Sequence, residues 1–441
     1  MTHQHPATPT RAELAALVQK PGPARLRRAS NILALLGAVV FVAGLLRGEE
    51  RVWQAWHVNW LFFTVIASAA VALAAVQRIT TARWSRAVIR IAEAQVAWLP
   101  VAFLLLLVTV LFGKEHVFPW VHEPPPQPEK QIWLDPLFWS SRTLVVFGLI
   151  AGLSLWFVYT SVRLDVAVLP EWGAQWARGI RDRMRRNFGD ERRELHRTHS
   201  LQGKLAVLLA LVFGFGWVVL AWDLSMSVDP HFQSTMYGWQ FFMGGWLASL
   251  MAFALLARFW RRHLGADNVI TESHYHDIGK LCFGFTAFWG YLTFSQLLVI
   301  WYGNVGEETH FFRLRLTQPW TGLTVSVVVL SFVLPFFGLL GKAPKIFTPT
   351  MALFAASSMV GIWIHRYLEI YPLLHLGSGS VPFGLWEIGV TLGYLGLWGS
   401  SYLAFMDAFP RMRVFMLTSP YRDEVQVPVD PKTMEPLPAH E

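Results

Sequence analysis

Residues 203–223, GKLAVLLALVFGFGWVVLAWD, decide the fold class of this chain. Positions 205–222 carry no charged side chain, and only Lys204 and Asp223 interrupt the apolar character near the two ends. A helix needs about 20 mainly apolar residues to cross about 30 Å of hydrocarbon. The stretch therefore predicts a transmembrane helix.

The composition of the whole chain agrees with this prediction. Of its 441 residues, 54% are hydrophobic and 15% are charged, and the mean hydropathy is +0.38. A soluble domain is typically about 25% charged, so this chain lacks the polar side chains to cover a water-facing surface. The composition excludes a secreted disulfide module, a disordered protein and an ordinary soluble enzyme.

Nine further stretches meet the same length criterion. We therefore predict an all-α integral membrane protein of about ten transmembrane helices arranged as helical bundles. The expected domains are an N-terminal tail (1–29), a transmembrane domain (30–407) with a basic loop (about 161–204) and a proline-rich loop (about 113–138), and a C-terminal tail (408–441). The expected spans are 30–46, 58–77, 91–112, 139–160, 203–223, 239–258, 278–302, 319–340, 347–366 and 384–407.

The basic residues predict the orientation of these spans. When the loops are assigned to alternating sides, 29 of the 37 lysines and arginines fall on the side that carries both tails. Cytoplasmic loops carry the excess of basic residues, so both termini are expected in the cytoplasm. The net charge of +8 is therefore explained by basic loops that interact with anionic lipid at the membrane surface. No nucleic-acid partner is expected.

The sequence offers few ligands for a redox cofactor. Its one cysteine, Cys282, is too little for a disulfide, a cysteine-ligated cluster or a covalent haem. A b-type haem needs paired histidines inside facing helices, and the fifteen histidines fall in tails, loops or near span ends. We expect no cofactor and no metal in this chain, and no catalysis by the chain alone.

Polar residues gather at the outer end of the fifth span, in WDLSMSVDPHFQSTMYGW (222–239). Carboxylates at the edge of a low-dielectric region can pass protons, which makes Asp223, Asp229 and His231 candidates for proton transfer. The alternative is structural: Asp229 opens an Asp-Pro turn, and Asp223 pairs across a helix interface.

A second group stands at the cytoplasmic start of the seventh span, in TESHYHDIGK (271–280). His276 and Lys280 are four apart and Asp277 and Lys280 three apart, so they share one helix face. With His274 they form a candidate proton entrance, and a solvated helix end is the alternative.

Three further predictions concern single residues and a surface. Glu387 and Asp407 are carboxylates near the bilayer, and a carboxylate on an apolar helix is costly unless it is paired or hydrated; both are proton-transfer candidates. The outer end of the seventh span carries candidates for docking a partner subunit: Asn304, Glu307, Glu308 and Arg313.

Two stretches carry a resemblance to a known family: WDLSMSVDPHFQSTMYG (222–238) and TESHYHDIGKLCFGFTAFWGYLTFSQLLVIWYGNVGEET (271–309). They resemble the F subunits (ActF) of bacterial alternative complex III, a quinol:electron-acceptor oxidoreductase, which are membrane subunits of the NrfD or polysulfide-reductase type. The match covers roughly 200–316. It departs from the family pattern at Val228, Phe232, Val305 and Gly306.

The resemblance implies a non-redox membrane subunit of a quinol-oxidising respiratory complex that supports assembly and contributes to proton translocation. Its partners would be a homologous NrfD-like membrane subunit and subunits that hold iron–sulfur clusters and haem c. Quinol and these centres would then be bound by the partners. Two alternatives stay open: direct quinone binding by this chain, and a stand-alone secondary transporter.

Overall fold

The computed structural model describes residues 10–125 and 127–425, and this part of the chain is helical throughout, with no strand. The prediction of an all-α fold is confirmed for these residues. Ten long helices or helical runs form the body: α2 (Ala24–Leu46), α3 (Arg51–Ile79), the run from α4 (Ile89–Glu93) through α5 (Trp98–Val108) to α6 (Lys114–Val117), α8 (Pro136–Val168), α10 (Glu191–Leu224), α11 (Thr235–Leu264), α12 (Glu272–Gly303), the run from α14 (Thr321–Val328) to α15 (Leu334–Gly338), α17 (Thr348–Leu374) and α18 (Leu385–Ala408).

Eight of these, all except α17 and α18, are long and apolar enough to cross a membrane. The chain is thus an α-helical, multi-pass membrane protein. α17 and α18 have 27 and 24 residues and stand in the same bundle. Each of the ten expected spans overlaps one helix or helical run, and the total of ten crossings stays a prediction.

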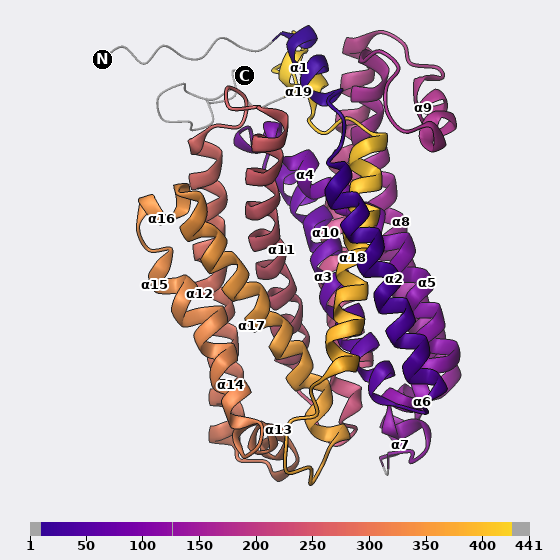
Figure 1. The fold of residues 1–441 in the computed structure, drawn as a ribbon, viewed down its shortest axis with the longest axis vertical. Coiled ribbons are helices and arrows are strands. Elements are labelled where there is room, and N and C mark those ends of the chain that lie inside the picture. Colours follow the sequence, from indigo (N-terminus) through magenta and orange to yellow (C-terminus); the bar gives the residue numbers. More distant parts are fainter. Residues whose placement is uncertain (1–9, 126, 426–441) are drawn as a thin grey trace, which may run out of the picture.

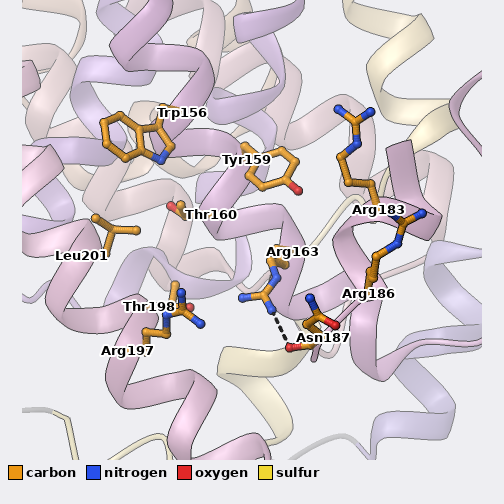
Figure 2. A pocket seen from close by; sticks show the side chains of 10 residues that line it. All are labelled: Trp156, Tyr159, Thr160, Arg163, Arg183, Arg186, Asn187, Arg197, Thr198 and Leu201. Carbon is orange, nitrogen blue, oxygen red and sulfur yellow. Dashed lines mark hydrogen bonds between the residues drawn. The ribbon is translucent and has the colours of Figure 1, made fainter. Parts of the chain in front are cut away.

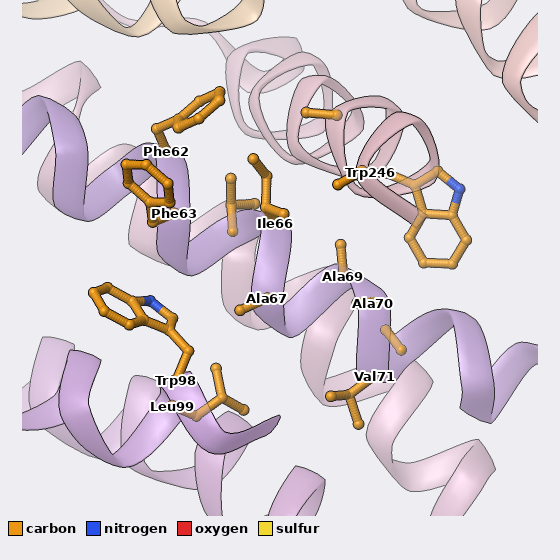
Figure 3. Packing of buried hydrophobic residues seen from close by; sticks show 14 of the residues in the cluster. Phe62, Phe63, Ile66, Ala67, Ala69, Ala70, Val71, Trp98, Leu99 and Trp246 are labelled. Atoms are coloured by element: carbon orange, nitrogen blue, oxygen red, sulfur yellow. The ribbon is translucent and has the colours of Figure 1, made fainter. Parts of the chain in front are cut away.

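Helix α3 is the centre of the molecule. The most apolar window of α3 is buried along its whole length, because α5, α10, α11, α17 and α18 all pack against it. Figure 3 shows part of this packing. Phe63 of α3 lies beside Trp98 of α5, and Trp246 of α11 lies farther along α3. Ala67, Ala69 and Ala70 are fully buried, and such small side chains let membrane helices approach closely.

The helices form two neighbouring groups (Figure 1). One group surrounds α3 and comprises α2, α5, α8, α10 and α18; the other comprises α11, α12, α14 and α17. The groups meet where α11 contacts α10 and where both α11 and α17 contact α3.

Glycines bring the first and the last long helix together. α2 packs on α18 more extensively than any other two helices pack on each other. A Cβ atom built on Gly393 would lie 2.7 Å from the Cα atom of Gly37, and one built on Gly396 would lie 2.3 Å from the backbone nitrogen of Ala34. We call these residues the glycine seam; its close approach leaves no space for side chains.

The two ends of the bundle differ in composition. At the termini end, α1 (Arg11–Val18) lies beside α19 (Val414–Thr418), and Arg11 binds both Glu191 and Thr418. Helix α9 (Arg178–Arg185) lies at this end too. The opposite end, which we call the α13 end, carries α7 (Pro128–Trp133) and α13 (Gly306–Leu316).

Several helices extend one or two turns beyond the expected spans, because polar residues continue the helices beyond the apolar core. The N-terminal tail gives way to α2 at Ala24 rather than at residue 30, and the basic loop is shortened to 169–190 by the ends of α8 and α10. The expected span 347–366 continues to Leu374. The terminal parts of the two expected tails, residues 1–9 and 426–441, lie outside the described residues.

Candidate functional site

The α13 end contains a buried ion cluster centred on Glu369 of α17. Arg366, one turn earlier, donates to both carboxylate oxygens at 2.8 and 2.7 Å, and the hydroxyl of Ser225 donates to Oε2 at 3.2 Å. Arg366 is fully buried and Glu369 is 3% exposed. Because the charges have left water, each depends on the other for compensation. We call this group the Glu369 cluster.

Four elements converge on this cluster. Ser225, at the end of α10, lies 2.6 Å from the hydroxyl of Tyr237 on α11. The second guanidinium nitrogen of Arg366 donates to the carbonyl of Phe241 at 3.1 Å. Arg315 of α13 donates to the carbonyls of Leu368 and Glu369. The cluster therefore fixes α10, α11, α13 and α17 to one another.

A cavity of about 480 Å³ opens at the same end of the bundle. It is lined by Trp222, Met226 and residues 233–236 from one stretch, and by Gln296, Val299, Ile300 and Glu308 from the other. Met226 follows Ser225 directly. Both sequence stretches singled out above thus contribute to one cavity at the α13 end.

Asp223 forms a second buried charge pair near this end. Arg142 of α8 donates to both of its carboxylate oxygens at 2.8 Å, and Trp133 of α7 donates at 3.0 Å. Asp223 therefore pairs across a helix interface.

Asp229 and His231 occupy the turn that follows. Asp229 accepts hydrogen bonds from the backbone N–H groups of His231 and Phe232 at 3.2 and 3.3 Å. This is a side-chain-capped turn. The His231 side chain is exposed.

Glu387 is held by four donors at the start of α18. Arg51 donates at 2.9 and 2.7 Å, Tyr371 at 3.1 Å and the backbone N–H of Gly384 at 2.7 Å. The side chain is 1% exposed. Glu387 thus joins the beginnings of α3 and α18 to the end of α17.

His375 adjoins Glu387, in the loop just beyond α17. Its Nε2 atom lies 2.8 Å from the side-chain oxygen of Gln54. Burial, and then the positive charge of Arg51, lower the pKa of His375 below its ordinary value. The neutral ring donates Nε2–H to Gln54.

A third ion cluster lies at the termini end, centred on Glu93 of α4. Arg90 binds Glu93 at 2.6 Å and also binds Asp165 of α8. Arg413 binds the other oxygen of Glu93, and the backbone N–H of Phe415 donates to Asp165 at 2.8 Å. The Glu93 cluster therefore anchors the segment after α18 to the body.

Polar side chains of the central helix lie between these clusters. Trp98 donates to Thr64 at 3.2 Å, Trp217 donates to Ser68 at 2.9 Å, and Trp363 donates to Asn59 at 3.0 Å. Asn59, Thr64 and Ser68 are all buried. The interior of the bundle therefore has polar groups at several levels of α3.

The remaining proton-transfer candidates lie at the termini end. The ion pair between Asp277 and Lys280 that their spacing predicts is present, at 2.8 Å. His274 accepts the backbone N–H of Thr271 at 3.1 Å, and His276 lies partly exposed on the same turn. Asp407 pairs with Arg411 at 3.1 Å and with Arg27.

The docking candidates lie together at the α13 end. Asn304 ends α12 in a left-handed conformation with φ of 46°. Glu307, Glu308 and Arg313 follow on α13; Glu308 is partly buried, and the other two are exposed. Trp301 and Tyr302, at 70% and 78% exposed, give this corner an apolar surface beside its charges.

Two histidines stand deeper in their helices than expected. His57 is fully buried in α3 with Nε2 2.6 Å from the carbonyl oxygen of Leu224, and His365 lies inside α17, 3.7 Å from Glu369. Their helices extend past the expected span ends. Among the described residues, no group of three or more His, Cys, Asp and Glu side chains is arranged to hold a metal.

Sequence reasoning missed the centre of the site. Arg366 and Arg315 are among the eight lysines and arginines that the orientation prediction places on the opposite side from the tails, yet both are buried. The available signal was the i,i+3 spacing of Arg366 and Glu369, which places them on one helix face.

No protein-family model matches the sequence, and no curated protein matches it.

Proposed function

We propose that this chain is the F-type membrane subunit of a bacterial alternative complex III, a quinol-oxidising respiratory complex. In this role it holds no redox centre, stands in the bacterial cytoplasmic membrane beside a homologous NrfD-like subunit, and supports partners that carry iron–sulfur clusters and haem c. The sequence resemblance is the origin of this proposal. The multi-pass helical fold is compatible with it.

One observation carries the proposed contribution to proton transfer: the cavity formed by the two family-like stretches is lined by Met226, the residue next to Ser225 of the Glu369 cluster. The cavity lining includes Met226 and Glu308, and Ser225 connects Tyr237 with Glu369 by hydrogen bonds. Buried carboxylates in membrane proteins mark proton pathways, and Ser225 connects Glu369 to the stretch that lines the cavity. We assign the α13-end half channel to this path.

The Glu93 cluster is the corresponding candidate at the termini end. It contains two carboxylates and two arginines, so its formal charge is balanced. Ser161 donates to Glu93 at 3.1 Å. Buried carboxylates of this kind mark proton pathways in membrane proteins.

The test is purification of the tagged chain from its own membrane in mild detergent. We expect haem c absorbance and quinol:acceptor activity to copurify with it. A chain that purifies alone, without haem, contradicts the proposal and favours the transporter alternative.

The proton-transfer part is tested in the purified complex after reconstitution into vesicles. Glu369→Gln, Asp223→Asn and Glu387→Gln are compared with Glu129→Gln, which changes an exposed carboxylate at the same end. Fewer protons released per electron in Glu369→Gln, measured on the fraction of complex that assembles with its full haem content, supports the half channel. An unchanged ratio in all variants removes proton transfer and leaves the supporting role.

A further inference from the structure

A basic pocket at the termini end is unrelated to the ion clusters described above. Figure 2 shows it between α8, α9 and α10, with Arg163 central, Arg183 and Arg186 on one side and Arg197 on the other. Its volume is about 320 Å³. Trp156 and Tyr159 of α8 form the apolar part of its wall.

Three of the four arginines carry uncompensated charge. Arg163 pairs with Glu194 at 2.6 Å and donates to the carbonyl of Asn187 at 3.3 Å. Arg183, Arg186 and Arg197 are exposed and form no ion pair with any carboxylate in the described part of the chain. The pocket therefore concentrates positive charge that no carboxylate among the described residues pairs with.

The pocket lies at the boundary between lipid and water. Trp156 on α8 is 52% exposed, and Trp176, just before α9, is 62% exposed; tryptophan is enriched at the level of lipid headgroups. Helix α9 turns Arg181 and Met184 inward, where both are buried, and leaves Arg178 and Arg183 exposed. Such an amphipathic helix rests in the membrane interface.

An apolar groove of about 490 Å³ adjoins the pocket. Tyr159 lines both, and Ile180 and Met184 of α9 line the groove together with Leu155 and Val158 of α8. A polar pocket beside an apolar groove fits a molecule with an anionic head and hydrocarbon chains.

We propose that this pocket binds the phosphodiester headgroup of an anionic phospholipid, whose acyl chains lie against Trp156, Tyr159 and the adjoining groove. Arginine forms paired hydrogen bonds with phosphate oxygens, and basic pockets between transmembrane helices bind anionic lipid headgroups. A free phosphate ion would bind the arginines and leave the apolar groove without an occupant. An acidic protein segment would not need the groove.

The test uses the full-length chain in nanodiscs of phosphatidylcholine with increasing mole fractions of phosphatidylglycerol. Retained lipid is counted by native mass spectrometry, and the thermal midpoint of unfolding is measured in parallel. The variant replaces Arg183, Arg186 and Arg197 with glutamine. The matched control replaces Arg25, Arg28 and Arg262 with glutamine; these three are exposed, and none is ion-paired in the described structure.

Each arginine near an anionic surface contributes about fivefold to binding, so the triple variant should bind phosphatidylglycerol on the order of 100-fold more weakly. The control should bind as the unchanged chain does. Equal losses in both variants, or undiminished binding in the first, would overturn the proposal.

Two further arms separate the ligand sources. Inorganic phosphate that reproduces the rise in thermal midpoint without lipid would replace the lipid by a free anion. An acidic protein that copurifies with the unchanged chain and is lost in the first variant, while phosphatidylglycerol binding is unaltered, would assign the pocket to a protein partner and overturn the lipid proposal. Neither readout depends on quinol oxidation, so the result is independent of the proposed function.

Discussion

Arg366 donates two hydrogen bonds to the carboxylate of Glu369, one turn later on α17, and both side chains are buried where four elements meet. Membrane helices avoid charged residues unless these are paired or reach water. The pair is therefore tightly constrained by the four elements around it.

Removing one partner of this pair should destabilise the fold. Glu369→Gln leaves Arg366 buried without a counter-charge, which costs about 3–5 kcal/mol. The double variant Arg366→Met, Glu369→Leu should recover much of that loss, because no isolated charge remains. Unfolding in detergent micelles measures both, and a double variant that is no better than Glu369→Gln would contradict a charge-based cause.

The glycine seam predicts a second effect on stability. Gly393→Val would place side-chain atoms inside the backbone of α2, and overpacking of this kind costs about 1–3 kcal/mol or more. Gly152→Val is the control, because a Cβ atom on Gly152 meets nothing within 4 Å. Thermal unfolding compares them, and equal midpoints would show that α2 can shift away from α18 without cost.

His375 should make stability depend on pH. Its pKa is lowered in the folded state, while the unfolded chain has the ordinary value of about 6.5. Below that value the unfolded state binds more protons, so stability falls as the pH decreases and levels off once the pH is below the folded pKa. His375→Gln should remove this part of the acid sensitivity and His231→Gln should not, which thermal midpoints across the range will show.

Orientation can be tested by thiol labelling in a Cys282→Ala background, since Cys282 is the single cysteine. A membrane-impermeant maleimide should label Glu307→Cys in intact cells and should label Asp190→Cys only after lysis. These positions lie at opposite ends of the bundle. The reverse pattern would place the termini outside and contradict the positive-inside assignment.

The Glu93 cluster at the termini end gives one more prediction. Asp165→Ala removes the acceptor of the Phe415 N–H and one partner of Arg90. The segment after residue 412 should then be cleaved faster by protease, while the transmembrane body stays resistant. Asp182→Ala, an exposed carboxylate on α9, should leave cleavage unchanged.

The helices could be predicted from the sequence because hydrocarbon sets their length and apolar content. The ends could not, since polar residues such as Glu191 and Arg193 extend α10 into water at the termini end, where no apolar signal marks them. Ion pairs between residues three apart on one helix, such as Asp277 with Lys280, could also be predicted from the sequence.

The buried centre was out of reach for a different reason. Arg142 and Asp223 are 81 residues apart, and Arg51 and Glu387 are 336 apart. Such pairings depend on which helices become neighbours. The expected span 347–366 ends at Arg366 because its charge interrupts the apolar run, whereas the helix continues to Leu374.

The pairing of α2 with α18 also constrains biosynthesis. Helix α18 is synthesised after the other long helices in the described part of the chain, so the glycine face of α2 has no partner until α18 has left the ribosome. Until then that face needs a lipid or a membrane chaperone against it. A nascent chain halted before α18 would leave the glycine face of α2 exposed. That exposed face distinguishes an incomplete molecule from a complete one.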